Sequence, residues 1–204
     1  MKLDPFYLIV DSVSWLERLL PHGVKLVQLR MKEARRNEVR SHITRAKALC
    51  EAYNCQLIVN DYWDLAIEEQ CTFIHLGQED LATADLTAIG KAGLKLGVSS
   101  HDLDELKIAL TIKPDYIALG PIYPTKLKKM PWAPQGIEKL RIWKEKMGSI
   151  PLVAIGGLTP VLATKALEAG ADSAAAITDI LTDDNPQARV KEWINATQKW
   201  RKAQ

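Results

Sequence analysis

Eight short apolar runs recur along the chain, and they constrain its fold more than any other feature. Within each run the apolar residues are continuous, whereas a strand with one wet face would alternate apolar and polar residues. Continuous runs are typical of parallel strands that are covered on both faces. The runs are FYLIV (6–10), KLVQLR (25–30), CQLIVN (55–60), TFIHLG (72–77), KLGVSS (95–100), YIALGPI (116–122), PLVAIGG (151–157) and SAAAIT (173–178).

Segments with apolar residues at helical spacing separate these runs. Several begin at Ser, Thr, Asp or Pro and end at Gly, which are the usual starts and stops of helices. The predicted helices span 12–20, 37–53, 62–69, 82–93, 101–110, 136–147, 159–170 and 185–200. Strands that alternate with helices every ~20–30 residues predict βα units and a parallel sheet.

Eight such units favour a closed (β/α)8 TIM barrel over an open doubly wound sheet. A length of 204 residues suits one barrel, so we expect a single catalytic domain over residues 1–204. The nucleotide-binding motifs G-x-G-x-x-G and G-x-x-x-x-G-K are absent from the sequence. In such barrels the active site lies at the C-terminal ends of the strands, so the residues that close each run are the candidates.

The charges of the chain nearly balance, with 27 basic and 25 acidic residues. This balance argues against a main role in binding nucleic acid or a membrane surface. No apolar run approaches the ~18 residues of a membrane helix, and the N-terminus lacks a signal-peptide pattern. Three cysteines without zinc-type spacing fit a reducing compartment better than a disulfide scaffold. We therefore expect a soluble cytoplasmic protein.

Long polar side chains close the second run. Side chains alternate along a strand, so Gln28, Arg30 and Lys32 point the same way and could clamp an anion. The alternative is that these three residues form an ordinary solvated strand exit.

Acidic residues close the third run and follow the fourth. Asp61 comes directly after Asn60, and Asp80 lies just beyond Gly77. Mg²⁺ is typically held by one or two carboxylates together with substrate phosphates, so the two acids could share one ion. The alternative for each is a helix N-cap. His75, in the fourth run, is more often a packed or hydrogen-bonded core residue than a ligand in such a position.

The fifth run ends in Ser99, Ser100 and His101. A Ser–His pair suggests nucleophilic catalysis, but no acidic third partner is evident in the sequence. A hydroxyl that binds a ligand or caps the next helix is therefore favoured. After the sixth run, the segment 124–136 carries three Pro and three Lys, which makes it a candidate lid.

The last two runs end in Gly156-Gly157 and in Ile177-Thr178. Barrels frequently bind phosphate with the loops after strands seven and eight. Glycine lets backbone N–H groups approach phosphate oxygens closely. With the acids, the basic clamp and the basic lid, this pattern predicts two anionic ligands that meet over one metal ion. Positioning and electrostatic stabilisation are then the available catalytic tools.

These residues resemble those of the thiamine phosphate synthase family, and the resemblance covers almost the whole chain. The motifs that carry it occur in the same order: VQLRMK (27–32), VNDYWDLAI (59–67), HLGQEDL (75–81), LGVSSHD (96–102), LGPIYPT (119–125), MPWAPQG (130–136) and VAIGGL (153–158). The family is a (β/α)8 barrel that is usually cytoplasmic and often dimeric. The resemblance therefore implies this fold and is compatible with a homodimer.

The resemblance also implies an activity. The enzyme would be a transferase that joins 4-amino-2-methyl-5-(diphosphomethyl)pyrimidine to 4-methyl-5-(2-phosphoethyl)thiazole, or to its carboxylated form. The products would be thiamine phosphate and diphosphate, and Mg²⁺ would be the cofactor. In the family the C–O bond breaks largely before the new bond forms, and the neutral thiazole nitrogen then attacks. No general base is needed for this substitution.

Site residues follow from the resemblance by position. The pyrimidine diphosphate would contact Gln28, Leu29, Arg30, Met31, Lys32, Asn60, Ser99 and Lys128. Asp61 and Asp80 would ligate Mg²⁺. The loop and the phosphate cup would contribute further substrate contacts, from Thr125, Lys126, Leu127, Gly157, Ile177 and Thr178. The catalytic residues would be Arg30, Lys32, Ser99 and Lys128.

The sequence departs from the family in the loop after the sixth run. The family usually has Thr-x-Thr-Lys there, whereas this chain has Thr125-Lys126-Leu127-Lys128, so Leu127 lacks the second hydroxyl. Two other functions are therefore considered. A thiazole tautomerase, a related barrel, would need the phosphate cup and a base but not Asp61 and Asp80. A non-catalytic barrel that binds thiazole phosphate is favoured by Leu127 alone.

Overall fold

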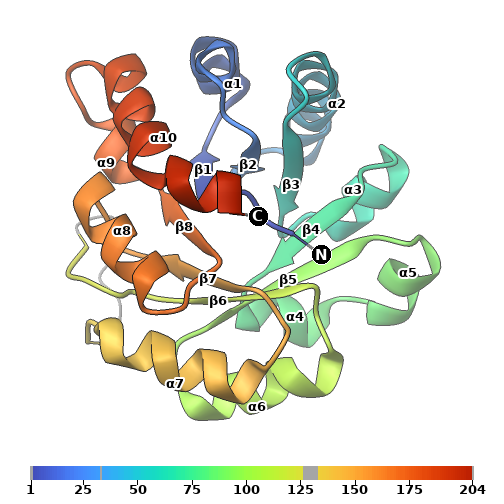
Figure 1. Cartoon of the computed structure of the whole chain (residues 1–204). Coiled ribbons are helices and arrows are strands. Elements are labelled where there is room, and N and C mark those ends of the chain that lie inside the picture. The colour runs from blue at the N-terminus through green and yellow to red at the C-terminus, as the bar shows by residue number, and fades with distance from the viewer. Residues whose placement is uncertain (1, 33, 126–132, 204) are drawn as a thin grey trace.

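Eight parallel strands form a closed barrel in the computed structural model, which describes residues 2–32, 34–125 and 133–203. Each strand pairs with the next, and the last pairs with the first, which confirms the predicted (β/α)8 fold (Figure 1). The strands are β1 Phe6–Val10, β2 Leu26–Leu29, β3 Gln56–Asn60, β4 Phe73–Leu76, β5 Lys95–Ser100, β6 Tyr116–Leu119, β7 Leu152–Ile155 and β8 Ser173–Ala176.

Helices surround the strands on the outside of the barrel (Figure 1). They are α1 Val13–Leu19, the 3-10 helix η1 Leu20–His22, α2 Arg36–Ala52, α3 Trp63–Glu68, α4 Gln78–Thr83, α5 Leu86–Lys91, α6 Leu103–Ile112, α7 Ile137–Met147, α8 Pro160–Glu168, α9 Thr178–Leu181 and α10 Pro186–Ala203. Among the described residues, no helix is long and apolar enough to cross a membrane.

Two short helices differ from the prediction. The helix expected at 82–93 begins later, as α5 at Leu86, because Asp85 accepts a hydrogen bond from the Ala88 N–H and caps it. Residues 82 and 83 instead end α4, a helix that the sequence did not predict. α9 begins at Thr178, where the sequence predicted the end of a strand. Both α4 and α9 directly follow strands, so they bring their first residues to the end of the barrel where the strands finish.

The hydrophobic core has two layers, because each strand is buried on both faces. The outer layer lies between the strands and the helices and contains Leu8, Val27 and Val59. The inner layer fills the barrel and contains Tyr7, Ile9, Ile58, Phe73 and Tyr116. Burial on both faces is the reason why the strand sequences show continuous apolar runs. Toward the strand ends the interior becomes polar, with Gln28, Asn60 and His75 all buried.

Candidate active site

A cavity of about 640 Å³ opens at the C-terminal end of the barrel, and residues from all eight strands line it. This is the end at which barrels of this kind place their active sites. The cavity brings together most of the residues that the sequence singled out: Gln28, Arg30, Lys32, Asn60, Asp61, Asp80, Ser99, Thr125, Gly157, Ile177 and Thr178.

Some predicted contacts lie elsewhere. Leu29 and Met31 are buried in the outer core layer and do not line the cavity, because strand alternation turns them away from Gln28 and Arg30. Their side chains therefore pack against the surrounding helices. Lys126, Leu127 and Lys128 lie outside the described residues, as does most of the predicted lid.

The residues that follow β2 bring a basic side chain into contact with an acidic one. Arg30 and Lys32 both line the cavity, as their alternation predicts. The Lys32 ammonium donates to an Asp61 carboxylate oxygen at 2.5 Å, so the basic clamp and the acidic edge meet. The Arg30 guanidinium has no ion pair to another described residue and borders the cavity.

Helix capping does not explain Asp61, the residue that directly follows β3. The N-cap of α3 is Tyr62, and its side chain makes no capping bond. Asp61 has a left-handed backbone with φ 66°, and its N–H donates to the His75 carbonyl at 2.9 Å. This conformation turns the chain sharply at the end of the strand and leaves the carboxylate beside the cavity, where it lines the wall.

Asp80 lies next to Asp61 although the two follow different strands. It sits in the first turn of α4, whose N-cap is Gly77 without a side-chain capping bond. The pKa of the Asp80 carboxyl is raised by burial and, next, by the charge and hydrogen bonding of Asp61. Two close carboxyl groups disfavour their own ionisation and favour a bound cation.

The donor set fits a hard divalent ion such as Mg²⁺. Carboxylate oxygens are its preferred protein ligands, and one or two usually suffice when substrate phosphates complete the shell. Within the described ranges, no group of three or more His, Cys, Asp or Glu side chains is arranged to hold a metal. A fully protein-built cage of the kind that zinc uses is therefore not present in this part of the chain.

The Asn60 amide is buried at the cavity wall, with 4% of the residue exposed. Its Nδ2 atom has no hydrogen-bond partner among the described residues. Buried amide donors are nearly always paired, so an unpaired one beside a cavity indicates a ligand with an acceptor atom.

Ser99 pairs with a histidine, but not with its neighbour in the sequence. Ser99 Oγ hydrogen-bonds to Nε2 of His75 at 2.9 Å, and Nδ1 of His75 bonds to the Tyr116 hydroxyl at 2.7 Å. Burial lowers the pKa of His75 to about 4. His101 instead bonds through Nδ1 to Glu105 at 2.7 Å. Among the described residues, both ring nitrogens of His75 bond to hydroxyl groups and none to a carboxylate, so these residues do not form a serine-nucleophile triad.

Tyr7 and Tyr116 were missed by the sequence reasoning. Each lies in the barrel interior on a strand whose other residues are apolar, and each extends the polar contacts of the cavity wall inward. The sequence feature that could have identified them is a tyrosine inside an apolar strand. A buried tyrosine hydroxyl usually has a hydrogen-bond partner, so such a residue indicates a polar contact in the core.

The loops after β6 and β7 pack closely at the predicted phosphate cup. Gly156 and Gly157 have φ 97° and 65°, a region that glycine adopts without strain. A Cβ on Gly157 would lie 2.5 Å from the Pro124 carbonyl oxygen, and one on Gly156 would lie 2.7 Å from Pro121. Glycine at both positions is therefore required by conformation and by space.

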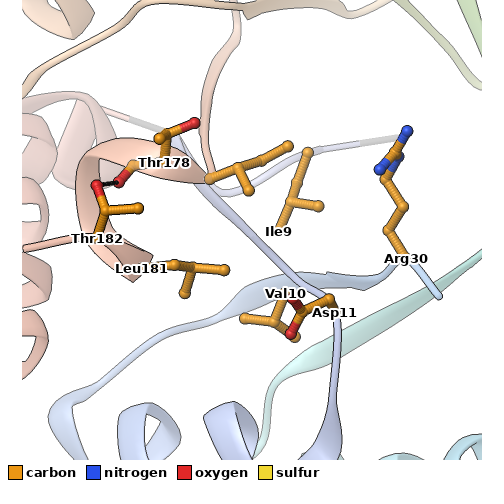
Figure 2. Close-up of a pocket in the computed structure, with 8 residues that line it drawn as sticks. Ile9, Val10, Asp11, Arg30, Thr178, Leu181 and Thr182 are labelled. Carbon is orange, nitrogen blue, oxygen red and sulfur yellow. Dashed lines mark hydrogen bonds between the residues drawn. The ribbon is translucent and has the colours of Figure 1, made fainter. Parts of the chain in front are cut away.

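A smaller cavity of about 250 Å³ adjoins the main one beneath the start of α9. Figure 2 shows Ile9 between Thr178 and Arg30, which border both cavities. The Thr182 hydroxyl donates to the Thr178 carbonyl at 2.8 Å and joins the two ends of the first turn of α9. The wall of the main cavity thus continues into this recess.

Comparison with known families and proteins gives one consistent result. The family model described as thiamine monophosphate synthase matches residues 6–180. A thiamine-phosphate synthase of Rhizobium etli is 61% identical over 201 residues, which is 98% of this chain and 98% of that protein. A thiamine-phosphate synthase of Citrobacter koseri is 48% identical over 191 residues, which is 94% of this chain and 87% of that protein.

Solved structures agree with the sequence comparison. A thiamine phosphate pyrophosphorylase from Pyrococcus furiosus matches with a TM-score of 0.86 and 26% identity, covering 97% of this chain and 96% of that one. A 3-hexulose-6-phosphate synthase matches with a TM-score of 0.67 and 15% identity, covering 96% and 99%. The second likeness concerns the fold alone.

Proposed function

The chain belongs to the thiamine monophosphate synthase family, a family of transferases in thiamine biosynthesis, and from this premise we propose its reaction. The enzyme joins 4-amino-2-methyl-5-(diphosphomethyl)pyrimidine to 4-methyl-5-(2-phosphoethyl)thiazole, or to its carboxylated form, and releases diphosphate. The observation that carries this proposal is a single cavity in which Arg30 and Lys32 lie close to Asp61 and Asp80, while the Gly156–Gly157 loop lines another part of its wall.

The pyrimidine diphosphate binds on the β2–β5 side of the cavity. Asn60, with its unpaired Nδ2, donates to an acceptor on this substrate. Gln28 and Ser99 contact the ring, because both are neutral hydrogen-bonding groups at the cavity wall. Arg30 and Lys32 bind the diphosphate, and Lys32 exchanges its bond to Asp61 for one to a phosphate oxygen.

Asp61 and Asp80 hold Mg²⁺, as their paired carboxyl groups and the raised pKa of Asp80 favour. When bound, the ion supplies positive charge that stabilises the departing diphosphate. Arg30 and Lys32, from the adjacent strand exit, add to this stabilisation. We assign the same role to Lys128, which lies outside the described residues.

The thiazole phosphate binds across the cavity, against β7, β8 and α9. The backbone of Gly157 and the Thr178 hydroxyl contact its phosphate, with Thr125 and Ile177 beside them. In this arrangement the thiazole nitrogen faces the pyrimidine carbon from which diphosphate leaves.

The substitution is dissociative, with departure of diphosphate ahead of attack by the thiazole nitrogen. That nitrogen is neutral and loses no proton as it forms the new bond, so the reaction needs no general base. The state of His75 agrees with this scheme, because Tyr116 and Ser99 occupy its two ring nitrogens.

The proposal extends to the setting of the enzyme. It acts on two small anionic substrates in the cytoplasm, without nucleic acid or membrane partners, and it can form a homodimer as family members often do. The near-balanced charge and the three free cysteines support this setting.

A direct assay tests the reaction. Purified protein with both substrates and Mg²⁺ should form thiamine phosphate, and an excess of EDTA should abolish the product until Mg²⁺ is restored. Absence of product with both substrates and Mg²⁺ present contradicts the proposed synthesis. Equal product in EDTA contradicts the metal role alone. Aromatisation of a thiazole phosphate tautomer without the pyrimidine would instead indicate a thiazole tautomerase.

A further inference from the structure

A continuous chain of hydrogen bonds crosses the barrel interior and ends at Ser99. It contains five side chains from five strands: Gln28, Tyr7, Tyr116, His75 and Ser99. The successive distances are 2.8 Å from Gln28 Nε2 to the Tyr7 hydroxyl, 3.0 Å to the Tyr116 hydroxyl, 2.7 Å to His75 Nδ1, and 2.9 Å from His75 Nε2 to Ser99 Oγ.

The first link fixes the direction of the first bond. The amide nitrogen of Gln28 can only donate, so the Tyr7 hydroxyl accepts from it. If Tyr116 also donated to Tyr7, the Tyr7 hydrogen would have no partner among the described residues. Tyr7 is 1% exposed, and buried hydroxyl donors are almost always paired. Because Tyr7 also borders the cavity, donation from Tyr7 to Tyr116 is the arrangement that satisfies the Tyr7 hydrogen without a ligand.

The same direction passes along the rest of the chain. Tyr116 accepts from Tyr7 and donates to His75 Nδ1. A neutral imidazole that accepts at Nδ1 carries its hydrogen on Nε2, so His75 donates to Ser99 Oγ. Ser99 Oγ then accepts inside the wall and keeps its own hydrogen for a partner in the cavity, which it lines.

The barrel interior leaves space for Tyr116, the middle residue of this hydrogen-bonded chain. Tyr116 pairs with Gly97 in the β5–β6 register. A Cβ at Gly97 would lie 2.1 Å from the Tyr116 ring, so glycine is required there for the ring to turn inward. The rings of His75 and Tyr116 lie at an interplanar angle of 18° with centroids 5.5 Å apart. Tyr116 is fully buried and does not line the cavity.

We propose that Tyr116 is a positioning residue that fixes the His75 tautomer and thereby makes Ser99 a hydrogen-bond donor to the substrate. At the other end of the chain, Gln28 commits its nitrogen to Tyr7 and presents its carbonyl oxygen as an acceptor. The wall then offers one acceptor and one donor, which match the amino group and a ring nitrogen of an aminopyrimidine. This inference rests on the proposed function, because it names the edge of that substrate.

The experiment is a double-mutant cycle between Tyr116→Phe and Ser99→Ala. Tyr116→Phe removes one buried hydroxyl that cannot touch the substrate, and it should raise KM for the pyrimidine diphosphate by about tenfold, the effect of one lost hydrogen bond. KM for the thiazole phosphate should stay within about twofold. Because Tyr116 acts through Ser99, the double variant should be no worse than Ser99→Ala alone, whereas independent effects would multiply to about a hundredfold.

A spectroscopic measurement needs neither a variant nor activity. The ¹⁵N shifts of His75 in the wild-type protein should show the Nε2–H tautomer, with the signal assigned by its loss in His75→Gln. In Tyr116→Phe the tautomer should shift toward Nδ1–H. Tyr53→Phe, which removes a hydroxyl from an exposed tyrosine, should change neither KM nor the tautomer.

Each outcome supports or overturns the inference. An Nδ1–H tautomer in the wild type overturns it, as do multiplicative losses in the cycle or equal losses for both substrates. If the wild-type protein forms no thiamine phosphate, the proposed function fails, while the wild-type tautomer still decides the direction of the chain. If Tyr116→Phe does not fold, the same wild-type measurement remains decisive.

Discussion

Asp61 and Asp80 follow neighbouring strands, and the parallel pairing of β3 with β4 brings their carboxyl groups together. The left-handed backbone at Asp61 and the first turn of α4 at Asp80 direct both toward the cavity. Burial and, next, the nearby Asp61 raise the pKa of the Asp80 carboxyl. Two ionised carboxylates repel each other, and a bound cation would remove this repulsion.

Replacing either carboxylate by its amide tests the metal role at the residue scale. Asp80→Asn and Asp61→Asn should each lower kcat/KM by about 100-fold or more, because charge that stabilises the departing diphosphate is lost. Steady-state kinetics over a range of Mg²⁺ concentrations measure the effect. Asp64→Asn is the matched control, since Asp64 pairs with Arg36 on the surface and should leave kcat/KM unchanged. Wild-type kinetics in both cavity variants would show that neither acid binds the ion.

The sequence predicted which types of residue line this site, but it did not predict which of them contact one another. Gln28, Arg30 and Lys32 reach the cavity because strand alternation is a local rule. Leu29 and Met31, taken over from the family motif, have side chains that face the outer core by the same rule. The partner of Ser99 could not be predicted, because His75 comes from the neighbouring strand and not from the adjacent sequence.

At the scale of elements, α10 holds α9 in place beside the phosphate cup. Asp179, next to Thr178 in α9, accepts from Arg189 Nε and NH2 at 2.9 and 2.8 Å. The Trp193 indole donates to the same carboxylate at 2.7 Å. The two donors on α10 neutralise and orient a carboxylate that borders the cavity, where its bare charge would oppose a phosphate.

The Arg189→Met variant tests this contact between helices. It should lower the free energy of unfolding by about 2 kcal/mol, because it leaves the Asp179 carboxylate largely buried with Trp193 as its remaining donor. The side chains of Arg189 and Asp179 are only 24% and 16% exposed. KM for the thiazole phosphate should also rise, since α9 carries Thr178. Urea unfolding and substrate kinetics measure the two effects.

Arg45→Met is the control for Arg189→Met. Arg45 pairs with Glu17, but their side chains are 66% and 40% exposed, and such pairs contribute roughly 0–1 kcal/mol. The Arg45→Met variant should leave KM for both substrates unchanged. If the two variants lose the same stability and neither changes KM, the contact between α9 and α10 has no special role.

At the scale of the whole molecule, β1 closes the barrel by pairing with β8 and anchors the last helix. Phe6 pairs with Ala174 in the register between these strands. Its ring faces outward and stacks on Trp193 of α10, with centroids 5.3 Å apart. The N-terminal strand and the C-terminal helix therefore depend on each other, and the closed sheet has no free edge.

Phe6→Ala should test this closure. Loss of a fully buried ring from the core should cost about 3–5 kcal/mol and lower Tm by roughly 10 °C in a chain of this size. Thermal unfolding followed by circular dichroism measures the shift. Leu103→Ala, which truncates an exposed leucine on α6, should shift Tm by no more than about 2 °C. Similar shifts for both variants would mean that this junction adds little to stability.

The order of strands and helices follows from local patterns in the sequence. β1 and β5 have the predicted bounds, and the other strands are shorter at their ends. The ends shorten because the sequence runs include the first loop residues, such as Gly156 and Gly157, which leave the sheet to form the cup. The late start of the helix expected at 82–93 depended on one cap, Asp85, whose strength a repeating apolar pattern does not reveal.

The sequence by itself determined the barrel, the order of its strands and the types of side chain at each strand end. Burial on both faces and helical spacing can be recognised from residues that are close together in the sequence. Only the tertiary structure decided which of those groups meet. Register around the closed sheet brings Asp61 to Asp80, His75 to Ser99 and Tyr116 to the space left by Gly97. These contacts join neighbouring strands, and their geometry depends on the register in which those strands pair and not on any one segment.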